Sequence, residues 1–215
     1  MLRTSPISTK NFFEKAKNKI LVSENRHQYL LKIAETIAKE YAKNELVNLN
    51  FICNDNSRRS QLAQIWSFYA ANYFQLNIHS FSGGVEIGCF NRSTIKTLQK
   101  VGFSFQLNNF SHQNPTYEIS FEGTKKHLTV FSKMFDDAEN PESFITIITC
   151  NVSDINIPII NAANHIFHLP FEDPKRADGT LKKDEMYLQI SRKIAGEIFI
   201  IFNEVKHQLS FPLEK

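Results

Sequence analysis

The feature that most constrains the fold of this chain is a strand, a polar loop and a helix that follow one another without a break. Residues 46–52 are mostly apolar and rich in β-favouring side chains, which predicts a strand. Residues 53–60 carry no aliphatic or aromatic side chain. A helix is predicted directly after them, because apolar side chains recur at helical spacing at Leu62, Ile65 and Tyr69. The chain therefore places a polar loop at the carboxyl end of a buried strand.

Strand and helix signals alternate through the rest of the chain. We expect strands at residues 76–81, 127–131, 144–149 and 166–169, helices at 91–101 and 184–206, and an irregular stretch at 104–126. Gly102 supplies a left-handed stop for the helix before it. This alternation predicts an α/β domain with a mostly parallel sheet.

The length of 215 residues suits one domain of moderate size with a terminal addition. Residues 10–44 show helical periodicity but no visible chemistry. We therefore predict an N-terminal helical extension over residues 1–45, packed on an α/β domain over residues 46–208. Ligands are expected at the carboxyl ends of the parallel strands. The features expected at that edge are Cys53, Ser82, Cys150 and the turn at residues 171–174.

Composition and charge exclude several other classes of protein. The formal net charge is +3 with both signs mixed along the chain, which gives no basic surface for nucleic acid. The apolar stretch Ile198–Phe202 is far shorter than the roughly 20 residues that span a bilayer, and residues 1–18 lack the apolar core of a secretion signal. The three cysteines suit a reducing compartment, and neither they nor the histidines show metal-ligand spacing. We expect a soluble, cytoplasmic protein without metal or cofactor, and without nucleic-acid or membrane partners.

The loop at residues 53–60 has the composition of an anion site. A loop between a strand and the start of a helix exposes several backbone N–H groups, and these groups and the helix dipole favour a bound anion. Cys53 feels the same potential, which favours its reactive thiolate. The planar guanidinium of Arg59 can bind two oxygens of a tetrahedral anion, and Ser60 can donate a hydrogen bond to the thiolate. We therefore predict Cys53 as the nucleophile and Arg59 as the anion clamp.

The rest of the loop is expected to bind the substrate. The predicted substrate-binding residues are Asn54, Asp55, Asn56, Ser57, Arg58 and Ser60. The Asn and Asp side chains among them tolerate the left-handed or turn conformations that a curled loop requires. The alternative is that Cys53 only ends a strand as a small buried side chain. A Cys-x5-Arg-Ser sequence between a strand and a helix favours the functional interpretation.

Phosphoryl transfer also needs a proton donor for the leaving oxygen. Asp173 is the candidate, because its turn follows a predicted strand and Pro174 stiffens the backbone beside it. The alternative is an ordinary Asp-Pro turn, and this reading is favoured when the dipeptide is considered alone.

Several short motifs, spread in order over residues 46–205, carry a resemblance to a known family. They are Phe51-Ile52-Cys53, Asn56-Ser57-Arg58-Arg59-Ser60, Ser82-Gly83-Gly84-Val85-Glu86, Phe131-Ser132-Lys133 with Asp136-Asp137, and Glu172-Asp173-Pro174-Lys175 with Asp178-Gly179. The chain resembles the low-molecular-weight protein tyrosine phosphatase and arsenate reductase superfamily, in particular a bacterial protein-tyrosine-phosphatase-like branch. The resemblance implies a three-layer α/β fold around a mostly parallel, roughly four-stranded sheet. It also implies a cysteinyl-phosphate intermediate on Cys53, with Arg59 as the oxyanion clamp and Asp173 as general acid and then base.

The chain departs from the family at several positions that bear on activity. The usual glycine of the loop is Asp55, whose carboxylate opposes anion binding unless it points outward. The cysteine that is common before the clamp is Arg58, which either adds positive potential or lies on the surface. Lys175 and Arg176 stand where phosphotyrosine enzymes often have tyrosines beside the substrate ring. The resemblance therefore does not extend to a phosphotyrosine preference.

We favour a phosphomonoester hydrolase with protein phosphotyrosine as the family's default substrate. The alternative enzyme is an arsenate reductase that uses an external thiol, because Cys150 matches the first cysteine of the family's redox relay while Ile157 stands at the second. Cys89 could replace the missing cysteine only if it lies near Cys53 or Cys150. A third interpretation is a non-catalytic oxyanion-binding module in which Asp55 has abolished turnover. All three predict a phosphate- or arsenate-type oxyanion as ligand, with phosphoproteins among the candidate substrates, and leave the oligomeric state open.

Overall fold

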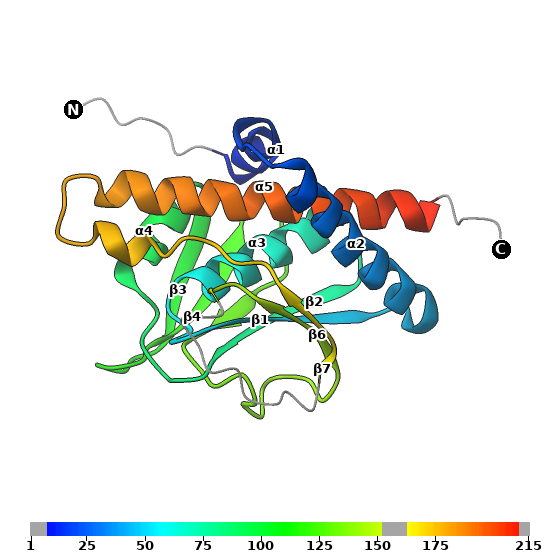
Figure 1. Ribbon diagram of the computed structural model, residues 1–215. Helices are drawn as coiled ribbons and strands as arrows, with labels where there is room; N and C mark the ends of the chain where they lie inside the picture. The colour runs from blue at the N-terminus through cyan, green and yellow to red at the C-terminus, as the bar shows by residue number, and fades with distance from the viewer. Residues whose placement is uncertain (1–7, 152–162, 211–215) are drawn as a thin grey trace.

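The computed structural model describes residues 8–151 and 163–210, and its centre is a parallel sheet of four strands (Figure 1). The strands lie in the order β2-β1-β6-β7. Their bounds are Val47–Cys53 for β1, Ile78–Gly84 for β2, Phe144–Ile148 for β6 and Ala163–His168 for β7. The predicted α/β class and the mostly parallel, four-stranded sheet are confirmed.

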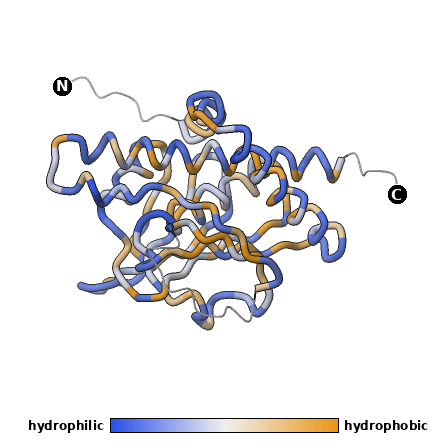
Figure 2. The backbone as a smooth tube through the Cα atoms, in the orientation of Figure 1, coloured by the Kyte–Doolittle hydropathy of each residue, from blue (hydrophilic) through white to orange (hydrophobic). Residues whose placement is uncertain are grey.

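Strand β1 lies inside the sheet and is buried on both faces. Leu49 and Phe51 belong to the main hydrophobic core, whereas Ile52 belongs to a smaller cluster that Phe135 packs against. On the same side as Ile52, the amide of Asn50 donates to the carbonyl oxygen of Phe135 at 3.2 Å. Both faces of β1 are therefore covered, which explains why most of its residues are apolar and only Asn48 and Asn50 interrupt them. Figure 2 shows hydrophobic residues concentrated along these central strands.

Helices α2, α3 and α5 form the main core with one face of the sheet. The helices are α1 Thr9–Lys19, α2 Glu24–Asn44, α3 Arg59–Tyr73, α4 Arg92–Lys100 and α5 Lys183–Ser210, with the short 3₁₀ helix η2 at Pro174–Ala177. Helix α5 runs across the molecule above α3 (Figure 1) and buries Ile194, Ile198 and Phe202. Helix α1 packs on α5 and inserts Phe13, whose ring stacks on Trp66 of α3 with centroids 5.7 Å apart.

The helical region predicted at residues 10–44 is two helices. Helix α1 ends at Lys19 and Ile20 is extended. The hydroxyl oxygen of Ser23 then accepts a hydrogen bond from the backbone N–H of Arg26 at 3.4 Å and caps the start of α2. Both helices contribute buried side chains, such as Phe13 and Ile33, to the core that they share with the sheet. The boundary at residue 45 stays a prediction.

The prediction of an irregular stretch at residues 104–126 is wrong. Strands β3 (Phe103–Asn109) and β4 (Thr116–Phe121) pair antiparallel there, and β5 (Leu128–Val130) joins them in a separate three-stranded sheet. Buried Phe103, Ile119 and Phe121 lie among exposed or partly exposed neighbours. A sheet with one wet face is polar on average, so its sequence resembles a loop. Gly102 has φ 100° after α4, which confirms the predicted left-handed stop.

Candidate functional site

The loop at residues 53–60, here called the anion loop, joins the carboxyl end of β1 to the start of α3. Cys53 is the last residue of β1 and is 2% exposed. Its Sγ lies 3.0 Å from the Oγ of Ser60, and the side-chain amide of Asn56 donates to the same Oγ at 2.8 Å. Because Asn56 donates to Ser60, the hydroxyl proton of Ser60 is left to point at the sulfur.

Asn56 is a buried residue whose hydrogen bonds connect the anion loop to neighbouring segments. It has φ 45°, in the left-handed region that asparagine tolerates better than most residues. Its Oδ1 accepts hydrogen bonds from the backbone N–H of Lys133 at 3.0 Å and from the side-chain amide of Gln61 at 3.1 Å. Gln61 also donates to the carbonyl oxygen of Phe131 at 2.8 Å. These uncharged bonds tie the loop to the segment that follows β5.

Three carbonyl groups of the anion loop are bonded to the segment that follows β2. Those of Asn54 and Asp55 accept hydrogen bonds from the N–H groups of Val85 at 2.8 Å and Gly88 at 3.2 Å, and that of Ser57 from Asn91 N–H at 3.2 Å. Because each peptide unit is planar and trans, the N–H that follows each carbonyl points the opposite way. These three N–H groups therefore point away from the segment after β2, an arrangement that suits an anion site.

Strand β2 supports this arrangement with a glycine. A Cβ on Gly84 would lie 2.6 Å from the carbonyl oxygen of Asn54, so only glycine lets the strand approach the loop this closely. The neighbouring Ser82 lies inside β2 and donates to the side chain of Gln64 at 2.6 Å. Ser57 is fixed from the same region, because its hydroxyl donates to the carbonyl oxygen of Cys89 at 2.6 Å.

Arg59 and Asp173 meet beside the anion loop. The Nη2 of Arg59 lies 2.9 Å from Oδ2 of Asp173, and its Nη1 donates to the carbonyl oxygen of Phe171 at 3.1 Å. The other carboxylate oxygen of Asp173 accepts the N–H of Lys175 at 2.9 Å and caps η2. A pocket of about 180 Å³ lies between these groups, lined by Asn54, Asp55, Arg58, Arg59, Asp173 and Lys175. Residues that are far apart in sequence are thus brought together around one small polar pocket.

Arg58 is buried rather than on the surface, and its guanidinium contacts a residue outside the pocket lining as well as one within it. It is 9% exposed, its Nη1 lies 3.3 Å from Asp55 Oδ2, and its Nε donates to the hydroxyl of Tyr187 at 3.1 Å. Burial lowers the pKa of Arg58, but Tyr187 and the nearby carboxylates outweigh this effect and the net shift is upward. Arg58 therefore stays charged and balances the carboxylate of Asp55.

Tyr187 connects Arg58 to Asp178. Asp178 is the last residue of the segment 170–178, which contains Asp173 and is called the acid segment below. The Tyr187 hydroxyl donates to Oδ1 of Asp178 at 3.1 Å. Burial raises the pKa of Tyr187 to about 12, with Asp178 adding to the shift and Arg58 opposing it. The phenol is therefore neutral at physiological pH and can donate and accept at the same time. Nothing in the sequence pattern distinguished Tyr187 from the other buried residues of its helix.

The N-terminal helices also reach the acid segment, through Arg26 of α2. Arg26 donates to both carboxylate oxygens of Glu197, at 2.7 and 2.8 Å, and to the carbonyl oxygen of Pro170 at 3.0 Å. Its guanidinium also lies over the ring of Phe171, 5.2 Å from the centroid. Burial raises the pKa of Glu197, an effect that Arg26 opposes. Arg26 and Arg59 thus hold the Pro170–Phe171 backbone from two sides.

The other two cysteines differ in their surroundings. Cys150 is fully buried in the small cluster that contains Ile52 and Cys53. Cys89 is exposed and follows the loop that bonds to Asp55. Ile157, the position of the second relay cysteine, lies outside the described residues. Across residues 8–151 and 163–210 no group of three or more His, Cys, Asp or Glu side chains is arranged to hold a metal ion.

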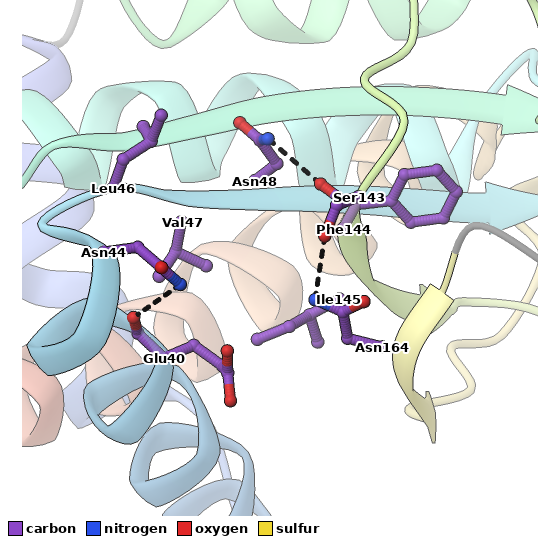
Figure 3. Close-up of a pocket in the computed structure, with 9 residues that line it drawn as sticks. All are labelled: Glu40, Asn44, Leu46, Val47, Asn48, Ser143, Phe144, Ile145 and Asn164. Atoms are coloured by element: carbon purple, nitrogen blue, oxygen red, sulfur yellow. Dashed lines mark hydrogen bonds between the residues drawn. The ribbon is translucent and has the colours of Figure 1, made fainter.

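A second cavity, of about 300 Å³, lies at the opposite end of β1 (Figure 3). There the side-chain amides of Asn48 and Asn164 donate to the carbonyl and hydroxyl oxygens of Ser143, at 3.0 and 2.8 Å. Glu40 contributes a carboxylate to the lining, which disfavours an oxyanion. Five residues of extended strand separate Asn48 from Cys53, about 17 Å. This cavity is therefore separate from the anion loop.

Comparison with known proteins gives matches among solved structures alone. No protein-family model matches the chain, and no curated protein matches it. An arsenate reductase in a phosphate-binding state shares 18% identity, with 76% of this chain and 99% of that chain covered and a TM-score of 0.45. A low-molecular-weight protein tyrosine phosphatase from Bacillus subtilis shares 15%, covering 75% and 98%, with a TM-score of 0.48. A thioredoxin-dependent arsenate reductase from Corynebacterium glutamicum shares 16%, covering 94% and 85%, with a TM-score of 0.42.

All three TM-scores lie below 0.5 and all three identities below 25%, so these similarities carry no argument about the chemistry of this chain. The chemistry that the site can support follows from its own geometry.

Proposed function

We propose that this protein is a phosphomonoester hydrolase of the low-molecular-weight protein tyrosine phosphatase type, acting through a cysteinyl-phosphate intermediate. The observation that carries the proposal is the closeness of three groups at the carboxyl end of β1. These are the backbone of the anion loop, the buried Cys53 sulfur that contacts Ser60 at 3.0 Å, and the Arg59 guanidinium, which lines the adjoining pocket and contacts Asp173 at 2.9 Å. Such a site stabilises a tetrahedral oxyanion beside a nucleophile and a proton donor.

In the first step, the loop amides and Arg59 bind the phosphoryl oxygens. Nη1 of Arg59 keeps its bond to Phe171, while a phosphoryl oxygen replaces the Asp173 carboxylate at Nη2. The Cys53 thiolate, held by the Ser60 hydroxyl, attacks phosphorus in line with the leaving oxygen. The S–P bond forms, the P–O bond breaks, and Asp173 in its acid form gives its proton to the departing alcohol.

In the second step, the Asp173 carboxylate takes a proton from water. The hydroxide attacks phosphorus, the S–P bond breaks, and inorganic phosphate leaves with the Cys53 thiolate restored. Asp173 regains its acid form, so that the cycle is closed without an outside reactant other than water.

The lining of the pocket bears on the substrate. Its side chains are polar or charged, with Lys175 at its edge and, among the described residues, no aromatic ring. Protein phosphotyrosine is the family's default substrate, but this lining supports phosphomonoesters without a requirement for a planar ring. Phosphoproteins remain among the proposed substrates. The Arg58–Asp55 pair offsets the charge of Asp55, which supports turnover over the non-catalytic alternative.

Arsenate reduction with an external thiol is the second candidate, because arsenate has the same shape and charge and needs only Cys53. The sulfur would attack arsenic with loss of water. A first thiol would then attack that sulfur and release arsenite, and a second thiol would reduce the mixed disulfide, which accounts for the two electrons.

The test is to assay phosphate release from p-nitrophenyl phosphate and thiol-dependent arsenite formation on one preparation, with Cys53→Ser and the exposed-site control Cys89→Ser. We expect phosphate release that is lost in Cys53→Ser and kept in Cys89→Ser. Arsenite without phosphate release would support the reductase. Neither activity, with sulfate binding retained, would support the oxyanion-binding module.

We also propose that the protein acts in the cytoplasm. Cys53 and Cys89 are free thiols, which suits a reducing compartment. No helix in the described ranges combines the length and apolar composition needed to cross a membrane. Fractionation of cells that express the tagged chain tests the proposal, and recovery outside the cytoplasm would contradict it.

A further inference from the structure

The free edge of the central sheet borders a groove that the proposed chemistry does not use. Its volume is about 420 Å³, and residues 78–81 of β2 line one side while residues 126–128, leading into β5, line the other. Phe68, Leu76 and Leu128 are large apolar side chains of the lining. The anion loop lies beyond the other end of β2, past Gly84.

The groove lies between β2 and β5, and it is closed at one end where β2 contacts the segment that follows β5. At the closed end Gly84 forms a parallel bridge with Met134, in which its N–H donates to the carbonyl oxygen of Lys133 at 2.8 Å and its carbonyl accepts from Phe135 at 2.9 Å. Toward Ile78 the two chains separate. In the described part of the chain, β2 then pairs with β1 alone and β5 with β4 alone.

Strand β2 presents backbone hydrogen-bonding groups to the groove. Both backbone groups of Gly84 point away from β1, whereas the carbonyl of Asn77 points toward it and accepts the N–H of Val47 at 3.2 Å. Because backbone groups alternate along a strand, Ser82, Ser80 and Ile78 turn theirs outward as Gly84 does. The side chain of Gln64 satisfies the carbonyl of Ser80 at 3.1 Å, and Ser82 is fully buried and does not line the groove. The outward backbone groups that line the groove are therefore those of Ile78 and the N–H of Ser80, and they form the kind of edge that accepts another strand.

The side chains around the groove indicate which strand would fit. His79, Lys126 and His127 are exposed, and the described lining contains no aspartate or glutamate. The apolar lining suits side chains on one face of an extended peptide, and the basic residues suit carboxylates on the other. The four β2 residues of the groove span about 13 Å, the length of a short added strand.

We propose that this groove binds an extended acidic segment of a partner protein as an added strand between β2 and β5. Backbone hydrogen bonds to β2 supply affinity, alternate apolar side chains fill the groove, and the exposed basic residues select acidic partners. This site is separate from the proposed active site and does not depend on its chemistry.

The test uses a fluorescent octapeptide of alternating valine and glutamate, with binding to the full chain followed by anisotropy. We expect saturable binding, with NMR amide shifts confined to residues 78–82 and 126–130. A valine and lysine peptide is expected to bind on the order of tenfold more weakly or worse. N-methylation of alternate peptide nitrogens is expected to abolish binding, because it removes the donors of one peptide edge.

The test variant carries both Lys126→Glu and His127→Glu. The matched control is Lys96→Glu on α4. The first is expected to weaken binding by about tenfold or more, and the control to leave it unchanged. Both should retain the circular dichroism spectrum and hydrolysis of p-nitrophenyl phosphate, since all three side chains are exposed. Equal binding of both peptides, loss of affinity in the control, or no binding at millimolar peptide would overturn the proposal. So would self-association of the chain that the double variant abolishes, because the occupant would then be a second copy.

Discussion

The anion loop and the acid segment meet at one pocket, but the molecule holds them in different ways. The anion loop is fixed by backbone hydrogen bonds and by the buried amides of Asn56 and Gln61. The acid segment is held by charged side chains, with Arg26 on one side and Arg59 on the other. Uncharged buried bonds respond little to pH or salt, whereas guanidinium contacts depend on their carboxylate partners. The difference implies that Cys53, the proposed nucleophile, is held rigidly and that the position of Asp173, the proposed proton donor, depends on side chains from distant parts of the chain.

Removing the central amide of the anion loop should have the largest effect. Asn56→Ala leaves the groups that bond to Asn56, including Lys133 N–H, without their buried partner, and alanine tolerates the left-handed conformation at φ 45° less well than asparagine does. We expect a loss of about 1,000-fold in kcat/KM, because the loop donors lose their alignment. We expect a loss of about 2 kcal/mol in the free energy of unfolding, measured by urea denaturation.

Asn56→Gly is the matched control for the backbone. Glycine keeps the left-handed conformation but lacks the amide, so it should recover little activity if the hydrogen bonds matter most. Recovery close to the unmodified protein would show that the conformation alone is needed, and the description of Asn56 as a connecting residue would be wrong.

Substitution of Asp173, the proposed proton donor, tests the contribution of the acid segment. Asp173→Asn should lower kcat/KM, which reports formation of the cysteinyl-phosphate, by about 100-fold for an alkyl phosphate, since a general acid is lost, with a smaller loss for p-nitrophenyl phosphate, whose leaving group needs no proton. Steady-state kinetics on the two substrates provide the measurement. An equal loss on both would mean that Asp173 orients the site without donating a proton.

The contribution of the N-terminal helices is tested at Arg26. Arg26→Met leaves Glu197 buried without its partner, which we expect to cost about 3 kcal/mol of stability near neutral pH. The acid segment loses one of its two supports, and kcat should fall by about tenfold with little change in KM. Urea denaturation and steady-state kinetics measure the two effects.

The pH dependence of this variant has a definite sign. Burial raises the pKa of Glu197, and loss of Arg26 removes the main opposing influence. A carboxyl group with a raised pKa in the folded state binds its proton more tightly there than in the unfolded chain, so stability falls as the pH rises between the two values. The deficit of Arg26→Met should thus be larger at about pH 8 than at about pH 5. A constant deficit would mean that it reflects packing alone, and Glu197→Gln in the same background should remove the pH dependence.

The smallest expected effect is at Tyr187. Tyr187→Phe removes the hydroxyl that joins Arg58 to Asp178, and we expect KM to rise by about threefold with kcat nearly unchanged. The pKa of about 12 keeps the phenol neutral over the assay range, so the shape of the pH profile should not change. Michaelis–Menten analysis across that range checks both points, and a shifted limb would contradict the positioning role.

The parts of the site that are contiguous in sequence could be predicted, and the parts assembled by packing could not. Cys53, Ser60 and Arg59 lie on one strand–loop–helix unit, so their closeness follows from local geometry. Asp173 was identified from its place after a strand, and its catalytic role stays a prediction. Arg26 reaches the acid segment across 144 residues and Tyr187 reaches Arg58 across 129, distances over which periodicity carries no information.

The same limit applies to the fold. The central strands β1 and β6 are buried and largely apolar, and the amphipathic helices have clear periodicity, so both could be predicted. The sheet of β3, β4 and β5 faces water on one side, and its sequence resembled a loop. Its pairing depends on contacts between strands, which no local pattern encodes.

The most direct test is to trap the covalent intermediate. Asp173→Asn should still form the S–P bond with p-nitrophenyl phosphate but hydrolyse it slowly, because the base for the water is missing. Rapid quenching followed by tandem mass spectrometry is predicted to find one phosphoryl group on the sulfur of Cys53. An unmodified Cys53 peptide during turnover, or undiminished phosphate release by Cys53→Ser, would contradict the proposed function.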